Sequence, residues 1–96
     1  MNIDYDKIEE LCGVDCLILL KENIEEVKKN INYLYKLGFN DIEDIFERYT
    51  YIFIRDYETF KKKLDKLIIR LGENYVNEIE TNLNLLEELE WSKYMI

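Results

Sequence analysis

Apolar residues recur at intervals of three and four along most of this chain, the spacing of one face of an α-helix. The pattern predicts helices over residues 5–12, 24–37, 41–48, 57–71 and 75–89. Three of them are followed by a glycine, namely Gly13, Gly38 and Gly72. Glycine adopts the left-handed conformation that ends many helices at little cost, so these positions support the predicted ends.

The segment YTYIFI at 49–54 is rich in β-branched and aromatic residues, which are typical of a strand. A single strand would have no partner here, so we interpret the segment as a connector with a short turn of helix. The pattern as a whole predicts an all-α fold of about five helices without a sheet.

Polar residues at the predicted helix starts have the spacing of local caps. Asn23 with Glu26, and Asn40 with Glu43, are three residues apart, as in a capping box. Asp56 and Asn74 are placed to cap the helices that follow them.

The chain also contains an internal repeat. KLGFNDIEDI at 36–45 returns as RLGENYVNEI at 70–79, an offset of 34 residues, and the apolar stripe upstream of each copy matches at an offset of 33. A helical period of this length predicts two stacked helix-pair repeats in one domain spanning 1–96. Repeats of this kind form binding surfaces more often than catalytic pockets.

The order of motifs within the repeat resembles that of the mitochondrial transcription termination factor (mTERF) family. A long helix ending in Leu-Gly precedes a short helix with spaced isoleucines and then an aromatic-aliphatic connector. The segments concerned are Leu34–Phe39, Ile42–Ile45 and Thr50–Ile54, with a second copy beginning at Leu67–Gly72 and Val76–Ile79. The resemblance covers about residues 20–90. It implies a helical-repeat fold that binds nucleic acid along a basic face.

Charge points to a different partner. The net charge is −8, with five acids and one lysine in residues 1–20, and six acids and one lysine in residues 71–96. Such a chain is repelled by nucleic acid at long range and attracted to a basic protein surface. We therefore expect a small acidic protein-binding module, an inhibitor or adaptor that acts on a basic nucleic-acid-binding protein, as phage or mobile-element proteins do.

The last predicted helix offers a candidate surface for that partner. Its carboxylates on the side opposite the apolar stripe are Glu73, Glu80, Glu87 and Glu88. Trp91 follows them beside other large apolar residues, and such a repeat end is typical of a partner surface or of a homodimer contact. The alternative interpretation is an ordinary solvated face.

The alternative function, a minimal mTERF-like nucleic-acid binder, would use the only basic cluster. Lys62, Lys66 and Arg70 fall along one edge of the helix predicted over 57–71. They could contact phosphates, or form a solvated face paired with the acidic ends.

Catalysis has little support in the sequence. The chain has no histidine, its only serine is Ser92, and it has no glycine-rich phosphate loop. Cys12 and Cys16 could supply half of a zinc site, but no other cysteine or histidine completes it. We expect them to be two small buried apolar residues without a disulfide. The sequence predicts no enzyme, no metal and no cofactor.

No apolar run approaches the ~20 residues that span a bilayer, and the longest notable one is CLILL at 16–20. The acidic start does not resemble a signal peptide. We therefore expect a cytoplasmic protein that does not enter a membrane.

Overall fold

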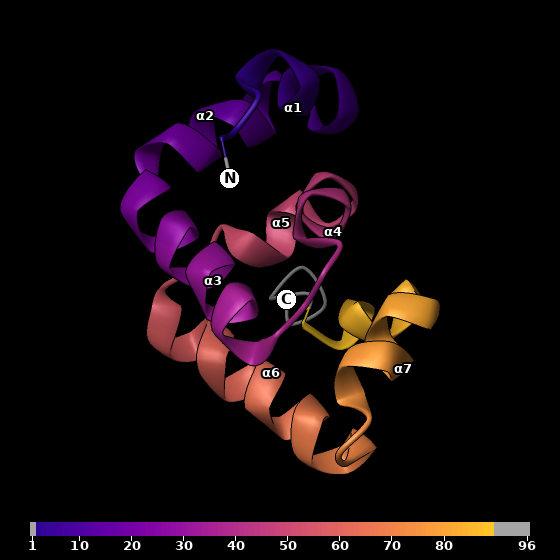
Figure 1. Ribbon diagram of the computed structural model, residues 1–96. Coiled ribbons are helices and arrows are strands. Elements are labelled where there is room, and N and C mark those ends of the chain that lie inside the picture. The colour runs from indigo at the N-terminus through magenta and orange to yellow at the C-terminus, as the bar shows by residue number, and fades with distance from the viewer. Residues whose placement is uncertain (1, 90–96) are drawn as a thin grey trace.

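The computed structural model describes residues 2–89, of which 81% are helical and none lies in a strand. The all-α expectation is therefore confirmed for this part of the chain. The predicted number of five helices is wrong, because residues 2–89 form seven α-helices and one 3₁₀-helix (Figure 1). In chain order they are α1 (Tyr5–Cys12), α2 (Val14–Glu22), α3 (Ile24–Leu37), α4 (Ile42–Arg48), α5 (Thr50–Phe53), α6 (Tyr57–Leu71), α7 (Tyr75–Thr81) and the 3₁₀-helix η1 (Leu83–Leu89).

Two of the additional elements lie where the sequence analysis assigned no separate helix. α2 begins directly after Gly13 and contains the apolar run CLILL. α5 is the short helical turn expected within YTYIFI, so that interpretation is confirmed. The helices predicted over 5–12, 24–37 and 57–71 have their predicted bounds.

The helix predicted over 75–89 is wrong, because it is divided at Asn82. Asn82 has φ −142° and ψ 81°, outside the helical region, and ends α7. The chain then continues as η1, in which Leu83, Leu86 and Leu89 are three residues apart. A 3₁₀-helix has three residues per turn, so this spacing places all three leucines on one side. Leu86 and Leu89 are buried there.

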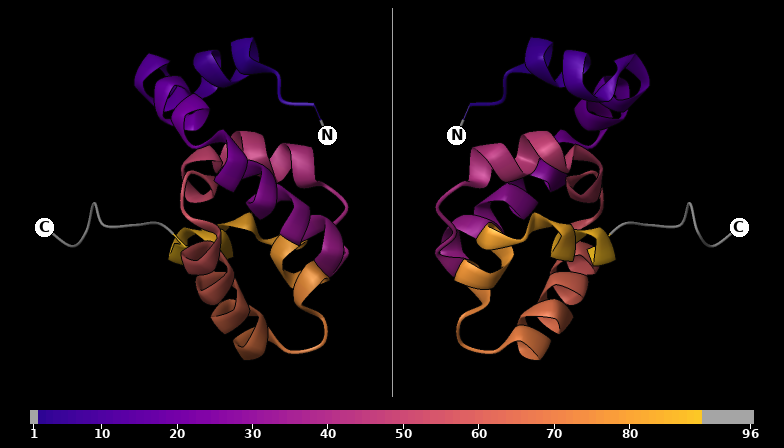
Figure 2. Two further views of the ribbon diagram at one scale, coloured as in Figure 1. Left: turned by 90° about the vertical axis from the view of Figure 1, so that its left-hand side faces the viewer. Right: turned by 90° about the vertical axis from the view of Figure 1, so that its right-hand side faces the viewer.

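The eight elements surround one apolar core. Each contributes at least one buried side chain to it, including Ile8 of α1, Leu20 of α2 and Leu86 of η1. α3 packs against α6, and η1 packs back onto both α6 and α7. Figure 2 shows α1 and α2 at one end of the molecule and the turn between α6 and α7 at the other.

The two predicted capping boxes do not form, because their side chains make other hydrogen bonds. The Asn23 amide donates to the carbonyl of Leu19 in the preceding helix, at 2.8 Å. Glu26 accepts instead from the backbone N–H of Tyr57, the first residue of α6, at 2.8 Å. Asn40 is not the N-cap of α4, which is Asp41, and its amide donates to Glu80, while Asn74 is the N-cap of α7 but makes no side-chain cap.

The cap predicted at Asp56 is confirmed. Its carboxylate accepts from the backbone N–H of Thr59 at 3.0 Å and from the Thr59 hydroxyl at 2.7 Å. These hydrogen bonds, the one from the hydroxyl foremost, lower the pKa of Asp56.

Polar side chains join the two halves of the chain. Asn30 of α3 is fully buried and donates to the carbonyls of Phe53 and Arg55, both at 2.8 Å. The Tyr33 hydroxyl donates to Asp65 of α6, and burial, together with this hydrogen bond, raises the pKa of Tyr33. These bonds fix α3 against the segment that leads into α6 and against α6 itself.

Candidate protein-binding surfaces

The four glutamates predicted to form one acidic row come from three parts of the structure. Glu73 lies in the turn between α6 and α7, Glu80 lies in α7, and Glu87 and Glu88 lie in η1. Because the helix is divided at Asn82, the four carboxylates do not share one helical face. Trp91, the fifth predicted residue, lies outside the described residues.

Glu80 caps another helix. Its carboxylate accepts from the backbone N–H groups of Asn40 and Asp41, at 2.7 and 2.9 Å, and from the Asn40 amide at 3.1 Å. These groups precede α4, where the helix dipole favours negative charge. Burial alone would raise the pKa of Glu80, but the hydrogen bonds from Asp41 and Asn40 outweigh it and the pKa is lowered.

Glu88 forms an ion pair with Arg70, which joins η1 to α6. The hydrogen bond from Arg70 lowers the pKa of Glu88. A hollow of about 350 Å³ lies beside this pair and is lined by Lys63, Lys66, Leu67, Arg70 and Glu88. One member of the predicted acidic row thus neutralises one member of the predicted basic face.

Lys62 and Lys66, the other members of that basic face, are exposed, and neither forms an ion pair with a described residue. On the acidic side, Glu73, Glu78 and Glu87 are exposed, and their carboxylates form no ion pair or hydrogen bond within residues 2–89. Glu78 was missed by the sequence analysis. The acidic character of α7 and η1 therefore comes from Glu73, Glu78 and Glu87.

The N-terminal pair α1 and α2 exposes apolar side chains that the sequence analysis did not assign to a surface. α2 is apolar on most of its sides, but only Cys16 and Leu20 are fully buried. Leu17 is partly buried against the core, whereas three other apolar residues of α2 and one at the end of α1 face solvent. These are Leu11 (57% exposed), Val14 (57%), Ile18 (49%) and Leu19 (43%), which we call the N-terminal apolar face. In the sequence, the apolar run CLILL at 16–20 was the only feature that could have indicated this face.

Charges around this face are unbalanced. Lys7 is paired with Glu47 of α4 at 3.0 Å, and Lys21 lies 5.3 Å from the centre of the Tyr5 ring. The remaining carboxylates of α1 and α2 are exposed and make no side-chain ion pair or hydrogen bond with any residue from 2 to 89. They are Asp6, Glu9, Glu10, Asp15 and Glu22. The N-terminal apolar face is therefore surrounded by negatively charged side chains.

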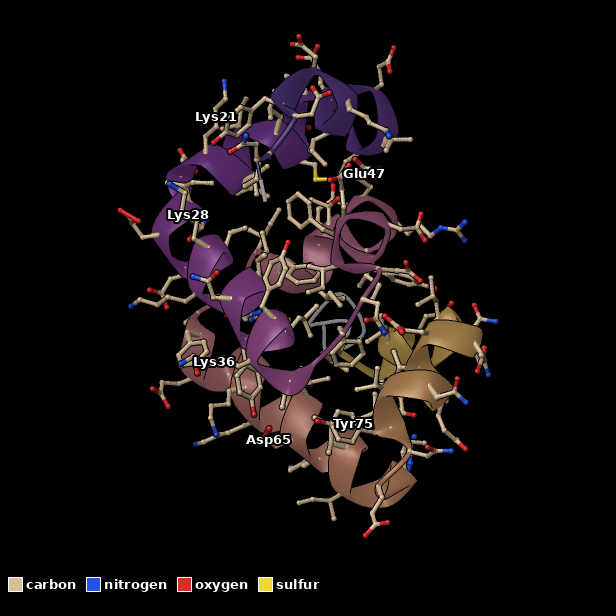
Figure 3. The ribbon with its side chains drawn as sticks, in the orientation of Figure 1. Lys21, Lys28, Lys36, Glu47, Asp65 and Tyr75 are labelled. Carbon is tan, nitrogen blue, oxygen red and sulfur yellow. A yellow bond between two sulfur atoms is a disulfide. The ribbon has the colours of Figure 1, made fainter. Side chains whose placement is uncertain are left out.

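A disulfide joins the two helices, which corrects the expectation that both cysteines are unpaired. Cys12 and Cys16 lie on either side of Gly13 with their Cα atoms 5.7 Å apart, within the range that a disulfide spans. Figure 3 shows the bond near Glu47. Cys16 is fully buried as expected, whereas Cys12 is only half-buried.

A hollow of about 370 Å³ lies between the end of α1, the α4–α5 corner and η1. Leu11 and Cys12 line it on one side and Tyr51, itself 52% exposed, on another. Glu47 and Glu87 are also part of its lining. The hollow therefore combines an apolar wall with carboxylates.

Residues 2–89 contain no group of three or more cysteine, aspartate or glutamate side chains placed to hold a metal ion. Within the same residues, no helix is long and apolar enough to cross a membrane. Comparison of the chain with protein-family models, curated proteins and solved structures found no match. The resemblance to the mTERF family therefore rests on the motif residues alone.

Proposed function

We propose that this chain is a small acidic, non-catalytic protein-binding module that acts as an inhibitor or adaptor on a basic partner, such as a nucleic-acid-binding protein. One observation carries the proposal. Eight exposed carboxylates at the two ends of the described chain form no ion pair within residues 2–89, namely Asp6, Glu9, Glu10, Asp15, Glu22, Glu73, Glu78 and Glu87. A basic surface would supply the missing counter-charges and be steered toward them.

The scaffold we propose for this function is a pair of stacked helical repeats. In each, a long helix (α3 or α6) is followed by a glycine with positive φ and a short helix (α4 or α7). The packing of α3 on α6 supports this interpretation. A rigid repeat of this kind would hold carboxylates from distant segments in a constant arrangement.

The C-terminal part of the proposed surface consists of Glu73, Glu78 and Glu87. Glu80 and Glu88 are left out of it because their oxygens already accept hydrogen bonds from Asn40, Asp41 and Arg70. Trp91 and a homodimer formed through the C-terminal end stay predictions, since residues 90–96 lie outside the described part.

The test starts from affinity capture in the native host, with co-purified protein and nucleic acid both identified. Binding to the captured partner is then measured for the variant E73K/E78K/E87K. We expect slower association and a weaker dependence on salt, because rim charges act mainly on the encounter rate. The variant K62E/K66E is the matched control and should not weaken binding to the partner. Unchanged binding by E73K/E78K/E87K, at every salt concentration, would exclude this part of the surface.

The alternative is a minimal mTERF-like nucleic-acid binder. Lys62 and Lys66 support it because both are exposed on one helix without an ion pair to a described residue. In that case K62E/K66E abolishes binding to a generic oligonucleotide, and E73K/E78K/E87K strengthens it by removing repulsion. The same two variants therefore separate the two functions.

A further inference from the structure

We propose that the N-terminal apolar face binds an amphipathic helix of the partner protein, one that carries lysine or arginine beside its apolar stripe. This inference rests on the proposed function and adds a surface and a class of ligand to it. Leu11, Val14, Ile18 and Leu19 are the residues that would touch the apolar stripe of that helix.

The first support is the exposure of these side chains. All four are between 43% and 57% exposed. Val14 and Ile18 are four residues apart in α2 and are therefore neighbours on its surface, and Leu11 lies at the end of α1, just before the Gly13 turn that leads into α2. Soluble proteins rarely expose contiguous apolar patches without a function, and such patches rimmed by polar residues are typical of binding sites.

The second support is the hollow that begins at Leu11. It offers about 370 Å³ between Leu11, Cys12 and Tyr51, enough for one large side chain of a ligand. Binding helices commonly place one or two apolar anchors into such pockets. Of the charged residues in its lining, Glu47 is paired with Lys7 and Arg48 with Asp44, whereas Glu87 forms no ion pair within residues 2–89 and favours a lysine or arginine next to that anchor.

The negative charge around the N-terminal apolar face favours a basic ligand. Five exposed carboxylates of α1 and α2 lack a partner, and both lysines of the same helices are engaged, Lys7 with Glu47 and Lys21 with the Tyr5 ring. A basic helix is attracted by this surround. An anionic lipid surface is repelled by it, and a second copy of the same face would bring like charges together.

The disulfide holds the N-terminal apolar face in one arrangement before a ligand binds. It links α1 to α2 across Gly13, so that Leu11 and the residues of α2 are held on one covalently closed corner. A surface held in its bound arrangement loses less conformational entropy when it binds.

The test uses the full chain and a synthetic peptide of about 18 residues, five helical turns, with leucines on one face and lysines elsewhere. Affinity is measured by fluorescence anisotropy. We expect the wild type to bind and V14S/I18S to bind about tenfold more weakly or worse, since two apolar contacts are lost. The variant I69S is the matched control, because Ile69 of α6 is 81% exposed and lies outside this face. Circular dichroism checks that both variants stay folded.

Each contrary outcome overturns the assignment of this surface. If V14S/I18S binds as the wild type does, or if a peptide with glutamate in place of lysine binds equally well, the proposal is wrong. It is also wrong if sedimentation shows a dimer that V14S/I18S dissociates, or if the face binds phosphatidylglycerol vesicles. The proposed function fails separately, when E73K/E78K/E87K and V14S/I18S both leave binding to the host partner unchanged.

Discussion

Arg70 and Glu88, which the sequence places on two competing surfaces, form an ion pair with each other. The pair closes η1 onto α6 and removes one charge from each candidate surface. Glu88 is therefore a poor choice for a binding variant, because its replacement disturbs the packing of η1 as well as the surface charge. The variants that test function should use carboxylates that make no such contact.

Glu80 is expected to stabilise the fold through its contacts with the start of α4. Replacement by alanine leaves the N–H groups of Asn40 and Asp41 without this acceptor, and should lower the free energy of unfolding by about 1 kcal/mol. Urea denaturation measures the change. Glu78→Ala, an exposed position in the same helix, is the control and should change stability by less than about 0.5 kcal/mol. Equal effects of the two variants would contradict the capping role.

The lowered pKa of Glu80 also predicts that the stability of the fold depends on pH. The pKa of Glu80 is lower in the folded chain than its ordinary value. Its ionised form therefore contributes stability at pH values above that ordinary pKa, and this contribution disappears as the pH falls through the folded pKa. The difference in unfolding free energy between wild type and Glu80→Gln should shrink over that acidic range. A difference that stays constant with pH would show that ionisation has no part in it.

Asn30 is expected to be a structural residue. It is fully buried, and its amide supplies hydrogen bonds to the carbonyls of Phe53 and Arg55. Asn30→Ala removes both bonds, and should cost about 1–3 kcal/mol because buried polar groups lose their partners. The neighbouring Asn32 is exposed, so Asn32→Ala should have little effect in the same thermal or urea measurement. A stable Asn30→Ala variant would mean that water replaces the amide.

Gly38 should resist replacement by residues with a branched side chain. It has φ 93° and ψ 17°, the left-handed conformation, and ends α3. Open space surrounds the position, so the cost of Gly38→Val comes from the backbone and should be about 1–2 kcal/mol. Gly38→Asn should cost less, since asparagine tolerates this conformation. Similar melting temperatures for both variants would argue against a backbone origin.

The disulfide should stabilise the corner between α1 and α2. It closes a very short loop, for which chain entropy predicts a contribution on the order of 2 kcal/mol. Titration of free thiols before and after reduction establishes the bond, and thermal unfolding measures its effect. Reductant should lower the stability of the wild type and leave that of C12A/C16A unchanged. A wild type that already has free thiols without reductant would contradict the bond.

Much of the architecture follows from local pattern. α3 and α6 have the bounds that their apolar stripes and terminal glycines predict, because both signals act within a few residues of the chain. The cap at Asp56 and the short helical turn of α5 are local in the same way. By contrast α2 was missed, since a helix that is apolar on most sides has little periodicity to recognise.

The candidate surfaces were decided by tertiary structure. Glu80 lies 40 residues from Asn40, and Arg70 lies 18 residues from Glu88, so no local spacing reveals either contact. The sequence by itself determined an acidic, helical chain with two similar halves. Only the packing of η1 on α6 and of α1 on α4 produced the long-range pairs Arg70–Glu88 and Lys7–Glu47, and only the tertiary structure left Val14, Ile18 and Leu19 of α2 exposed. The physical reason is that hydrophobic stripes and backbone preferences are local, whereas the exposure of a side chain and the partner of a charge depend on the whole fold.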